Sequence, residues 1–277
     1  MAQVLAVPGE VRHGFSFNCS FNHDFGRITG IAATAKGNVL LCDFDKKNLI
    51  LVDPLGNYLK NINVDSEPYD VAITGENVGY ITQPFTRSVL QIDPDRMIIV
   101  LKTSINDLGA TVMCSTAFST SLCFLCFNLE GQSYVYHAVN NAISFPNLSG
   151  HWSIGPHIIK CHAVDEGTCF SCHIGHNYIT ESKMTGHIFM RRQQNISIAT
   201  IDTPTDICSD DNGHIYVSGQ GSNNIHRLTQ EGKVIDIPLH SQHGIKQPVA
   251  VCFNQNYTKL YIVNEWGKSV FIFEVYR

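Results

Sequence analysis

The chain has 277 residues, enough to bury a large core in one domain or two. Its 44% hydrophobic and 16% charged residues favour a folded globule over a disordered chain. The formal net charge of −5 gives no overall attraction to nucleic acid, and no apolar run approaches the roughly 18 residues of a membrane helix. The N-terminus lacks the basic start of a signal peptide, so we expect a cytoplasmic protein without membrane or DNA partners.

Pairs of short apolar strands recur along the chain at a regular interval. The first pair is Gly37–Asp43 with Asn48–Asp53, two runs bounded by turn-forming residues. The later pairs are Val78–Gln83 with Ser88–Asp93, Cys123–Asn128 with Ser133–Tyr136, Thr168–His173 with Asn177–Thr180, Ile215–Gly219 with Asn224–Leu228, and Leu260–Asn264 with Ser269–Phe273. The ends of the first strands are 40, 45, 45, 46 and 45 residues apart. This period is typical of β-propeller blades.

The last repeat indicates how the ring closes. It has no room for an outer strand before the chain stops at Arg277, whereas the strand-like segment Val11–Asn18 precedes the first repeat. We therefore predict an all-β fold, a single six-bladed β-propeller with four antiparallel strands per blade, in which the N-terminal strand completes the last blade. An open array or a β-sandwich is the alternative. The expected blades cover residues 25–66, 67–107, 108–152, 153–200, 201–246, and 247–277 together with 11–18.

Two repeats carry a family resemblance. Ile28–Ala32, Gly37–Asp43 and Leu49–Gly56 resemble an NHL repeat, and so does the segment from Thr203 to Gly232. The chain as a whole is similar to the C-terminal propellers of tripartite-motif (TRIM) proteins. That resemblance implies a recognition module, not an enzyme, which selects protein or peptide partners for a ubiquitin ligase. RNA binding is the alternative function that it implies.

Propeller geometry places the loops after the second strands on one face together with the connections between blades. Aromatic residues beside arginine and lysine on that face are typical of peptide and single-stranded RNA sites. The predicted partner-binding residues are Arg27, Phe44, Lys46, Lys47, Tyr69, Phe85, Arg87, His173, His176, Trp266 and Lys268. Trp266 is the expected anchor, because an aromatic residue in a polar loop is hard to explain as core. Acidic residues in the same loops dilute the positive charge, and a solvated rim without a ligand remains open.

Two further patterns allow other chemistry. The second strands of five blades end in polar residues, which we interpret as acceptors for backbone N–H groups of the next loop. A third function would be a metal-dependent propeller enzyme, with candidates Asp43, Asp70, Asn128, His162, His173 and Asp206. No paired nucleophile and base fixes a reaction, so we predict no catalytic residues.

Cysteines are numerous, with ten in the chain. The two Cys-x-x-Cys strings, at Cys123 and Cys169, fall on strands, where residues three apart point to opposite faces and cannot share one ion. Cys161, His162, His173 and His176 could converge from neighbouring strands as a zinc site. Their spacing in the sequence is not sufficient to predict a zinc site, so we predict no metal and no cofactor.

Overall fold

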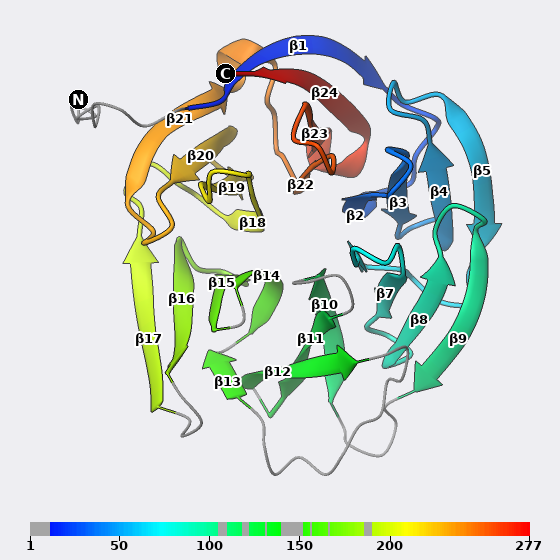
Figure 1. Ribbon diagram of the computed structural model, residues 1–277, viewed down its shortest axis with the longest axis horizontal. Helices are drawn as coiled ribbons and strands as arrows, with labels where there is room; N and C mark the ends of the chain where they lie inside the picture. The colour runs from blue at the N-terminus through cyan, green and yellow to red at the C-terminus, as the bar shows by residue number, and fades with distance from the viewer. Residues whose placement is uncertain are drawn as a thin grey trace.

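The computed structural model describes residues 12–104, 110–117, 122–130, 132–139, 152–155, 157–165, 167–185 and 190–277. Within these residues the chain forms six four-stranded antiparallel sheets arranged around a central axis, as predicted (Figure 1). Part of the expected third blade, 108–152, lies outside the described residues. No helix among the described residues is long and apolar enough to cross a membrane.

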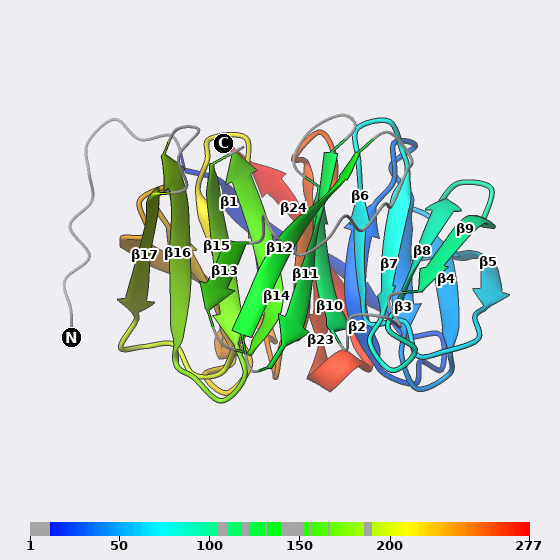
Figure 2. The same cartoon turned by 90° about the horizontal axis from the view of Figure 1, so that it is seen from below.

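The four strands of each blade follow one another from the axis to the rim (Figure 1), and most of them run between the two faces of the disc (Figure 2). The innermost strands are β2 Ile28–Ala33, β6 Asp70–Ile73, β10 Thr111–Ala117, β14 Ile158–Asp165, β18 Pro204–Ser209 and β22 Ala250–Phe253. The second strands are β3 Val39–Asp43, β7 Gly79–Gln83, β11 Leu122–Leu129, β15 Thr168–His173, β19 Ile215–Gly219 and β23 Lys259–Asn264. The third strands are β4 Asn48–Val52, β8 Ser88–Asp93, β12 Gln132–Val139, β16 Tyr178–Thr185, β20 Asn224–Leu228 and β24 Ser269–Tyr276. The outer strands are β5 Tyr58–Asn63, β9 Ile98–Ser104, β13 Trp152–Gly155, β17 Met190–Ser197, β21 Val234–His240 and β1 Gly14–Phe21.

The hydrophobic core lies between neighbouring blades. Successive side chains of a strand point to opposite faces of its sheet, so each blade packs against both neighbours. Leu40, for example, packs with Ile81 of the second blade, whereas the adjacent Leu41 packs with Tyr261 of the last blade. Strands β3 and β4 are buried along their whole length, and the outer strand β5 faces solvent.

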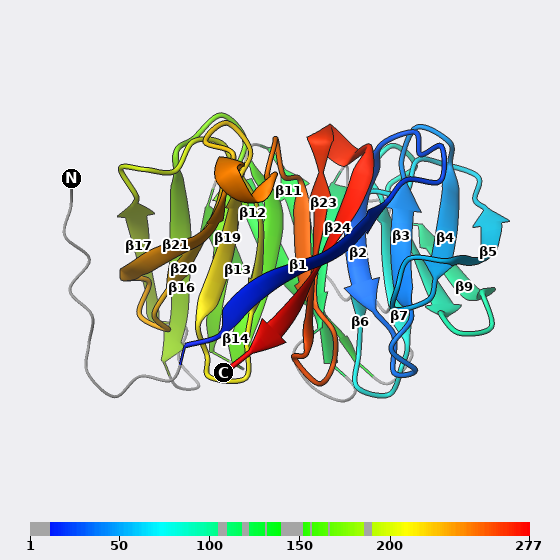
Figure 3. The same cartoon turned by 90° about the horizontal axis from the view of Figure 1, so that it is seen from above.

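The ring closes as the strand count predicts. Strand β1 pairs antiparallel with β24, so the last sheet has the order β1-β24-β23-β22 (Figure 3). The paired strand begins later than expected, at Gly14, and Val11 lies outside the described residues. A bulge at Asn18 shifts the register between Phe17 and Cys19. This closure covers the edge of β24, which would otherwise be open to pairing with another chain.

Candidate active site

Two of the polar residues that end second strands accept hydrogen bonds from backbone N–H groups, mostly from the loop before the blade and not from the following loop that we expected. The carboxylate of Asp43 accepts hydrogen bonds from the backbone N–H groups of Gly26, Arg27 and Lys46. Asn264 in the last blade accepts one from the N–H of Lys246. Since these side chains are engaged by backbone, they serve the fold and not a ligand at the channel mouth.

The predicted partner-binding residues divide into two groups. Around Arg27, the guanidinium carbon lies 4.5 Å from the centroid of the Phe44 ring and 5.7 Å from that of Trp266. Phe44 in turn contacts Phe85, with 5.9 Å between ring centroids, and Tyr69, with 6.3 Å. This cluster joins the first, second and last blades on one face, the face of the short 3-10 turn η3 Glu265–Gly267 (Figure 3). Its role in binding stays a prediction.

His173 and His176 lie elsewhere. Their rings contact each other and the ring of Tyr178 in the fourth blade, which stands across the ring from the first blade (Figure 1). Both histidines stand at the end of a second strand or just after it, as Trp266 does, so they lie on the same face of the disc but two blades away from it, and their role in binding stays a prediction.

Basic residues on the Trp266 face are offset by acidic neighbours. Lys46 Nζ lies 2.8 Å from a carboxylate oxygen of Asp24, and Lys47 Nζ lies 2.9 Å from one of Glu67. Arg27 is 3.4 Å from Asp45, and Lys268 donates to the carbonyl of Gly26. Arg87 is exposed and stands in a left-handed turn conformation, with φ of 49°. Because of these acidic neighbours, the lysines and Arg27 do not form the uniformly positive surface that nucleic acid binding needs.

A buried ion pair lies at the axis of the ring. Lys160 on β14 donates a hydrogen bond from Nζ to Asp70 on β6, and the two side chains are 3% and 8% exposed. The other carboxylate oxygen of Asp70 accepts from the backbone N–H of Ser115, 3.0 Å away. The ring of Tyr69 packs 5.4 Å from the Lys160 ammonium on the side of Phe44. Residues of the second, third and fourth blades therefore provide the hydrogen bonds and the ring contact of this ion pair.

Asp206 completes this axial charge cluster from the fifth blade. Its carboxylate accepts hydrogen bonds from the N–H groups of Val251 and Ile207, each 2.9 Å away. Burial raises the pKa of Asp206 to about 7, and the negative charge of Asp70 adds to the rise although Lys160 opposes it. A carboxyl group that titrates near neutrality can both take and give a proton at physiological pH.

Asp70, Lys160 and Asp206 occupy one structural position in three blades. Each is paired with the residue before the end of the neighbouring second strand, in the pairs Asp70 with Thr82, Lys160 with Cys172, and Asp206 with Ser218. The same position holds Gly30 in the first blade and Ala250 in the last. Asp70 and Asp206 are candidates from the sequence, whereas Lys160, which stands alone in an apolar run, is not.

A cavity of about 370 Å³ lies on the axis beside these charges. It is lined by the C-terminal parts of the inner strands, from Asp70 and Asp206 to the loop residues Asn254 and Tyr257. Because β22 runs from Ala250 away from η3, this cavity lies toward the face opposite Trp266. Its volume falls within the usual range for small-molecule sites, about 300–1,000 Å³.

One pair of polar side chains meets on the cavity wall. His162 Nε2 and Ser209 Oγ, from β14 and β18, are 2.8 Å apart, and both residues line the cavity. Burial lowers the pKa of His162 to about 4, so the imidazole is neutral at physiological pH. The sequence analysis expected no nucleophile or base in contact, because residues 47 positions apart show no such contact before the blades are stacked.

The metal-binding alternatives considered from the sequence do not assemble. His162 is engaged by Ser209, His173 by His176 and Tyr178, and Cys161 by two other cysteines. The carboxylates of Asp43 and Asp70 are held by backbone N–H groups and Lys160. Among the described residues, ligand-type side chains converge in only two groups, Cys114 with Cys126 and Cys161, and His13 with Asp210 and Asp211. The axial residues therefore do not fit a calcium or zinc centre of the kind considered from the sequence.

Comparisons with known proteins identify the fold. No protein-family model matches the chain, and no curated protein matches its sequence. A gluconolactonase from Xanthomonas campestris superimposes with a TM-score of 0.69 at 12% identity, over 92% of this chain and 88% of that one. A luciferin-regenerating enzyme gives 0.69 at 9% identity, over 94% and 95%. Virginiamycin B lyase from Staphylococcus aureus gives 0.65 at 11% identity, over 95% and 99%. At these identities the likeness establishes the fold alone.

These neighbours overturn the function predicted from the sequence. The predictions that the chain is no enzyme, and that it is a TRIM-like recognition module or its RNA-binding alternative, are wrong by comparison with these neighbours, which are named as gluconolactonases, a luciferin-regenerating enzyme and a streptogramin B lyase. Nothing in the comparisons supports the NHL or TRIM assignment specifically. The residues that carried that resemblance form strands and turns, which build a blade in any propeller and do not determine its chemistry.

The raised pKa of Asp206 predicts how stability depends on pH. Its folded-state pKa of about 7 lies above its ordinary value of 3.8, so between these values the folded chain holds a proton that the unfolded chain releases. The free energy of unfolding from this group is then largest below pH 4 and falls as the pH rises to 7. We expect Asp206→Asn to flatten that fall, measured by urea denaturation from pH 4 to 8. The exposed Asp45→Asn variant should keep the wild-type slope, and an equal slope in Asp206→Asn would contradict the assignment.

Proposed function

We propose that the protein is an enzyme that hydrolyses a small neutral ester or lactone in the axial cavity, with Asp206 as the base that activates water. The observation that carries the proposal is that this carboxyl group and the hydrogen-bonded pair of His162 and Ser209 line the same cavity, which is open on one side. The fold neighbours support an enzyme, and a gluconolactonase is among them. The free cysteines fit the predicted cytoplasmic location, where thiols stay reduced.

The cavity suits a small and uncharged substrate. Ile31, Val71 and Ile73 contribute apolar lining, whereas Ser115, Thr116, His162, Ser209 and Asn254 contribute polar lining. An anionic substrate would meet the carboxylates of Asp70 and Asp206, whereas the ammonium of Lys160 is already bonded to Asp70. An uncharged carbonyl compound, whose other polar groups can bond to the polar lining, fits this balance.

Asp206 would act first as base and then as acid. Its carboxylate takes a proton from a water molecule, which attacks the carbonyl carbon and forms a tetrahedral intermediate. The intermediate collapses by breaking the bond to the ring or ester oxygen, and Asp206 returns the proton to that leaving oxygen. No other reactant is needed, because water supplies both the hydroxyl group of the acid and the proton of the alcohol.

The pair of His162 and Ser209 would bind the carbonyl oxygen. With its proton on Nε2, neutral His162 donates to Ser209 Oγ, which leaves the serine hydroxyl free to donate to the substrate. That donor would stabilise the negative charge that develops on the carbonyl oxygen. His162 is a positioning residue in this scheme, and Ser209 contacts the substrate.

A lactone and ester panel tests the proposal. Purified protein is assayed with five- and six-membered aliphatic lactones and short aryl esters, and we expect hydrolysis that rises with pH through a midpoint near 7. Asp206→Asn should lower kcat/KM by about 10²–10⁴-fold and remove that midpoint, and Ser209→Ala should lower kcat by about 10²–10³-fold. Asp45→Asn on the opposite face is the control. Absence of hydrolysis across the panel, or wild-type rates in Asp206→Asn, would reject the function.

A further inference from the structure

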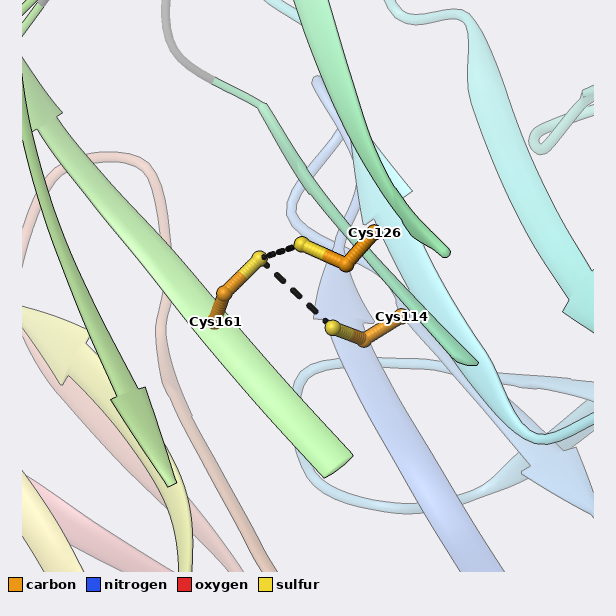
Figure 4. Close-up of side chains that lie close together, drawn as sticks. All are labelled: Cys114, Cys126 and Cys161. Atoms are coloured by element: carbon orange, nitrogen blue, oxygen red, sulfur yellow. Dashed lines mark hydrogen bonds between the residues drawn. The ribbon is translucent and has the colours of Figure 1, made fainter. Parts of the chain in front are cut away.

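Three cysteine side chains meet between the third and fourth blades. Cys114 on β10 and Cys126 on β11 face each other across neighbouring strands, and Cys161 reaches them from β14 (Figure 4). The Cys126 and Cys161 sulfurs are 2.7 Å apart, the Cys114 and Cys161 sulfurs are 3.5 Å apart, and all three lie within 4.8 Å of one another. Each of the three side chains is buried, with Cys161 the most exposed at 6%.

Packing alone does not account for this convergence. A buried cysteine normally behaves as a small hydrophobe among aliphatic neighbours, as Cys42 does among leucines and isoleucines. Here three sulfurs point at one spot, and the closest pair is nearer than two sulfurs pack without a shared proton, bond or ion. That separation is also longer than the roughly 2.05 Å of a disulfide bond.

From this geometry we infer that Cys114, Cys126 and Cys161 bind one soft metal ion through three sulfur atoms, with Cu(I) the best match. Soft thiolate ligands select Cu(I) and Zn²⁺ among the common ions. Structural zinc sites take four ligands, and among the described residues this group offers three. Three sulfurs in a plane complete the coordination of Cu(I).

The sulfurs need to move little to accept the ion. A metal–sulfur bond of about 2.3 Å in a trigonal arrangement separates the sulfurs by about 4 Å. The closest pair would then open by about 1.3 Å and the next by about 0.5 Å from the present distances of 2.7 and 3.5 Å. Rotation about the Cα–Cβ bonds is enough for shifts of this size.

The three sulfurs lie next to the axial cavity. Cys161 is one of the residues that line this cavity, so the distance between the cysteine group and solvent is short. The thiols release their protons to the buffer as the ion binds.

Anaerobic titration tests the site. The whole chain, reduced and freed of metal, is titrated with Cu(I) against a chromogenic Cu(I) chelator, and Zn²⁺ and Cd²⁺ are titrated in parallel. We expect one tightly held Cu(I) per chain, a sulfur-to-metal absorption band, and X-ray absorption from three sulfurs at about 2.3 Å. A higher Tm of the loaded protein provides a readout independent of activity.

Alanine variants identify the ligands. Cys114→Ala, Cys126→Ala and Cys161→Ala should each lose the stoichiometric uptake, with the folded state checked by circular dichroism. Cys123→Ala is the matched control, because Cys123 lies on the same strand as Cys126 but packs in a different cluster of the core. Uptake that persists in the triple variant, a coordination shell with fewer than three sulfurs, or a reduced protein that takes up no Cu(I) would each overturn the inference. A Cys126–Cys161 disulfide that survives reductant would overturn it as well.

Discussion

Replacing Lys160 with methionine is expected to lower the free energy of unfolding by about 3–5 kcal/mol, since it leaves the buried carboxylate of Asp70 without its cation. Methionine keeps most of the volume of the side chain, so the loss reports charge more than packing. The measurement is urea denaturation at pH 7, with the slope of the transition compared to confirm that both proteins unfold in the same way.

The double variant distinguishes a buried pair from a damaged core. Asp70→Asn removes the orphaned charge and retains an oxygen for the N–H of Ser115, so Lys160→Met with Asp70→Asn should regain most of the loss. Lys47→Met is the control, because Lys47 is 50% exposed beside Glu67 and such surface pairs contribute about 0–1 kcal/mol. A single-variant loss no larger than that of the control would mean that water in the cavity solvates Asp70.

Blade number and closure could be predicted from the sequence because their causes are local. Alternating apolar residues and turn formers define each strand, and Gly37 and Gly213 stand at turns with positive φ, where glycine carries no steric cost. A count of the strands then shows that the last blade lacks its outer strand and that one extra strand precedes the first blade. The bond from the N–H of Lys46 to Asp43 follows the same local rule and was expected, whereas the bond from Gly26, which lies before the blade, was not.

The site could not be predicted because its residues meet only when the blades are stacked. Lys160 stands 90 positions from Asp70, and His162 stands 47 from Ser209. One signal was available, since aligning the blades by their strand pairing places Asp70, Lys160 and Asp206 at one position. The resemblance misled for a related reason: it compared blade-forming residues, and function in this fold depends on what lines the axis.

Removing the N-terminal strand is expected to have the largest effect on the fold. A chain that begins at residue 22 lacks β1 and exposes the edge of β24 along Val270–Tyr276. It also loses Phe15, whose ring packs 5.8 Å from Tyr216 and 6.4 Å from Phe253, and the carbonyl of His13 that accepts from Arg227. We expect this chain to associate into larger species through the open edge, measured by size-exclusion chromatography with light scattering.

A peptide that supplies the strand should reverse that association. Residues 12–21 added in trans can pair with β24 in the register of the intact chain, as a donor strand does. The same peptide with a scrambled sequence is the control.

In the full chain, Phe15→Ala should lower the Tm by about 5 °C, since the ring is partly buried. Phe17→Ala on the same strand should change the Tm less, because Phe17 is 54% exposed. A monomeric, cooperatively folded chain without residues 1–21 would show that five complete blades and one three-stranded blade suffice, and that the clasp is dispensable.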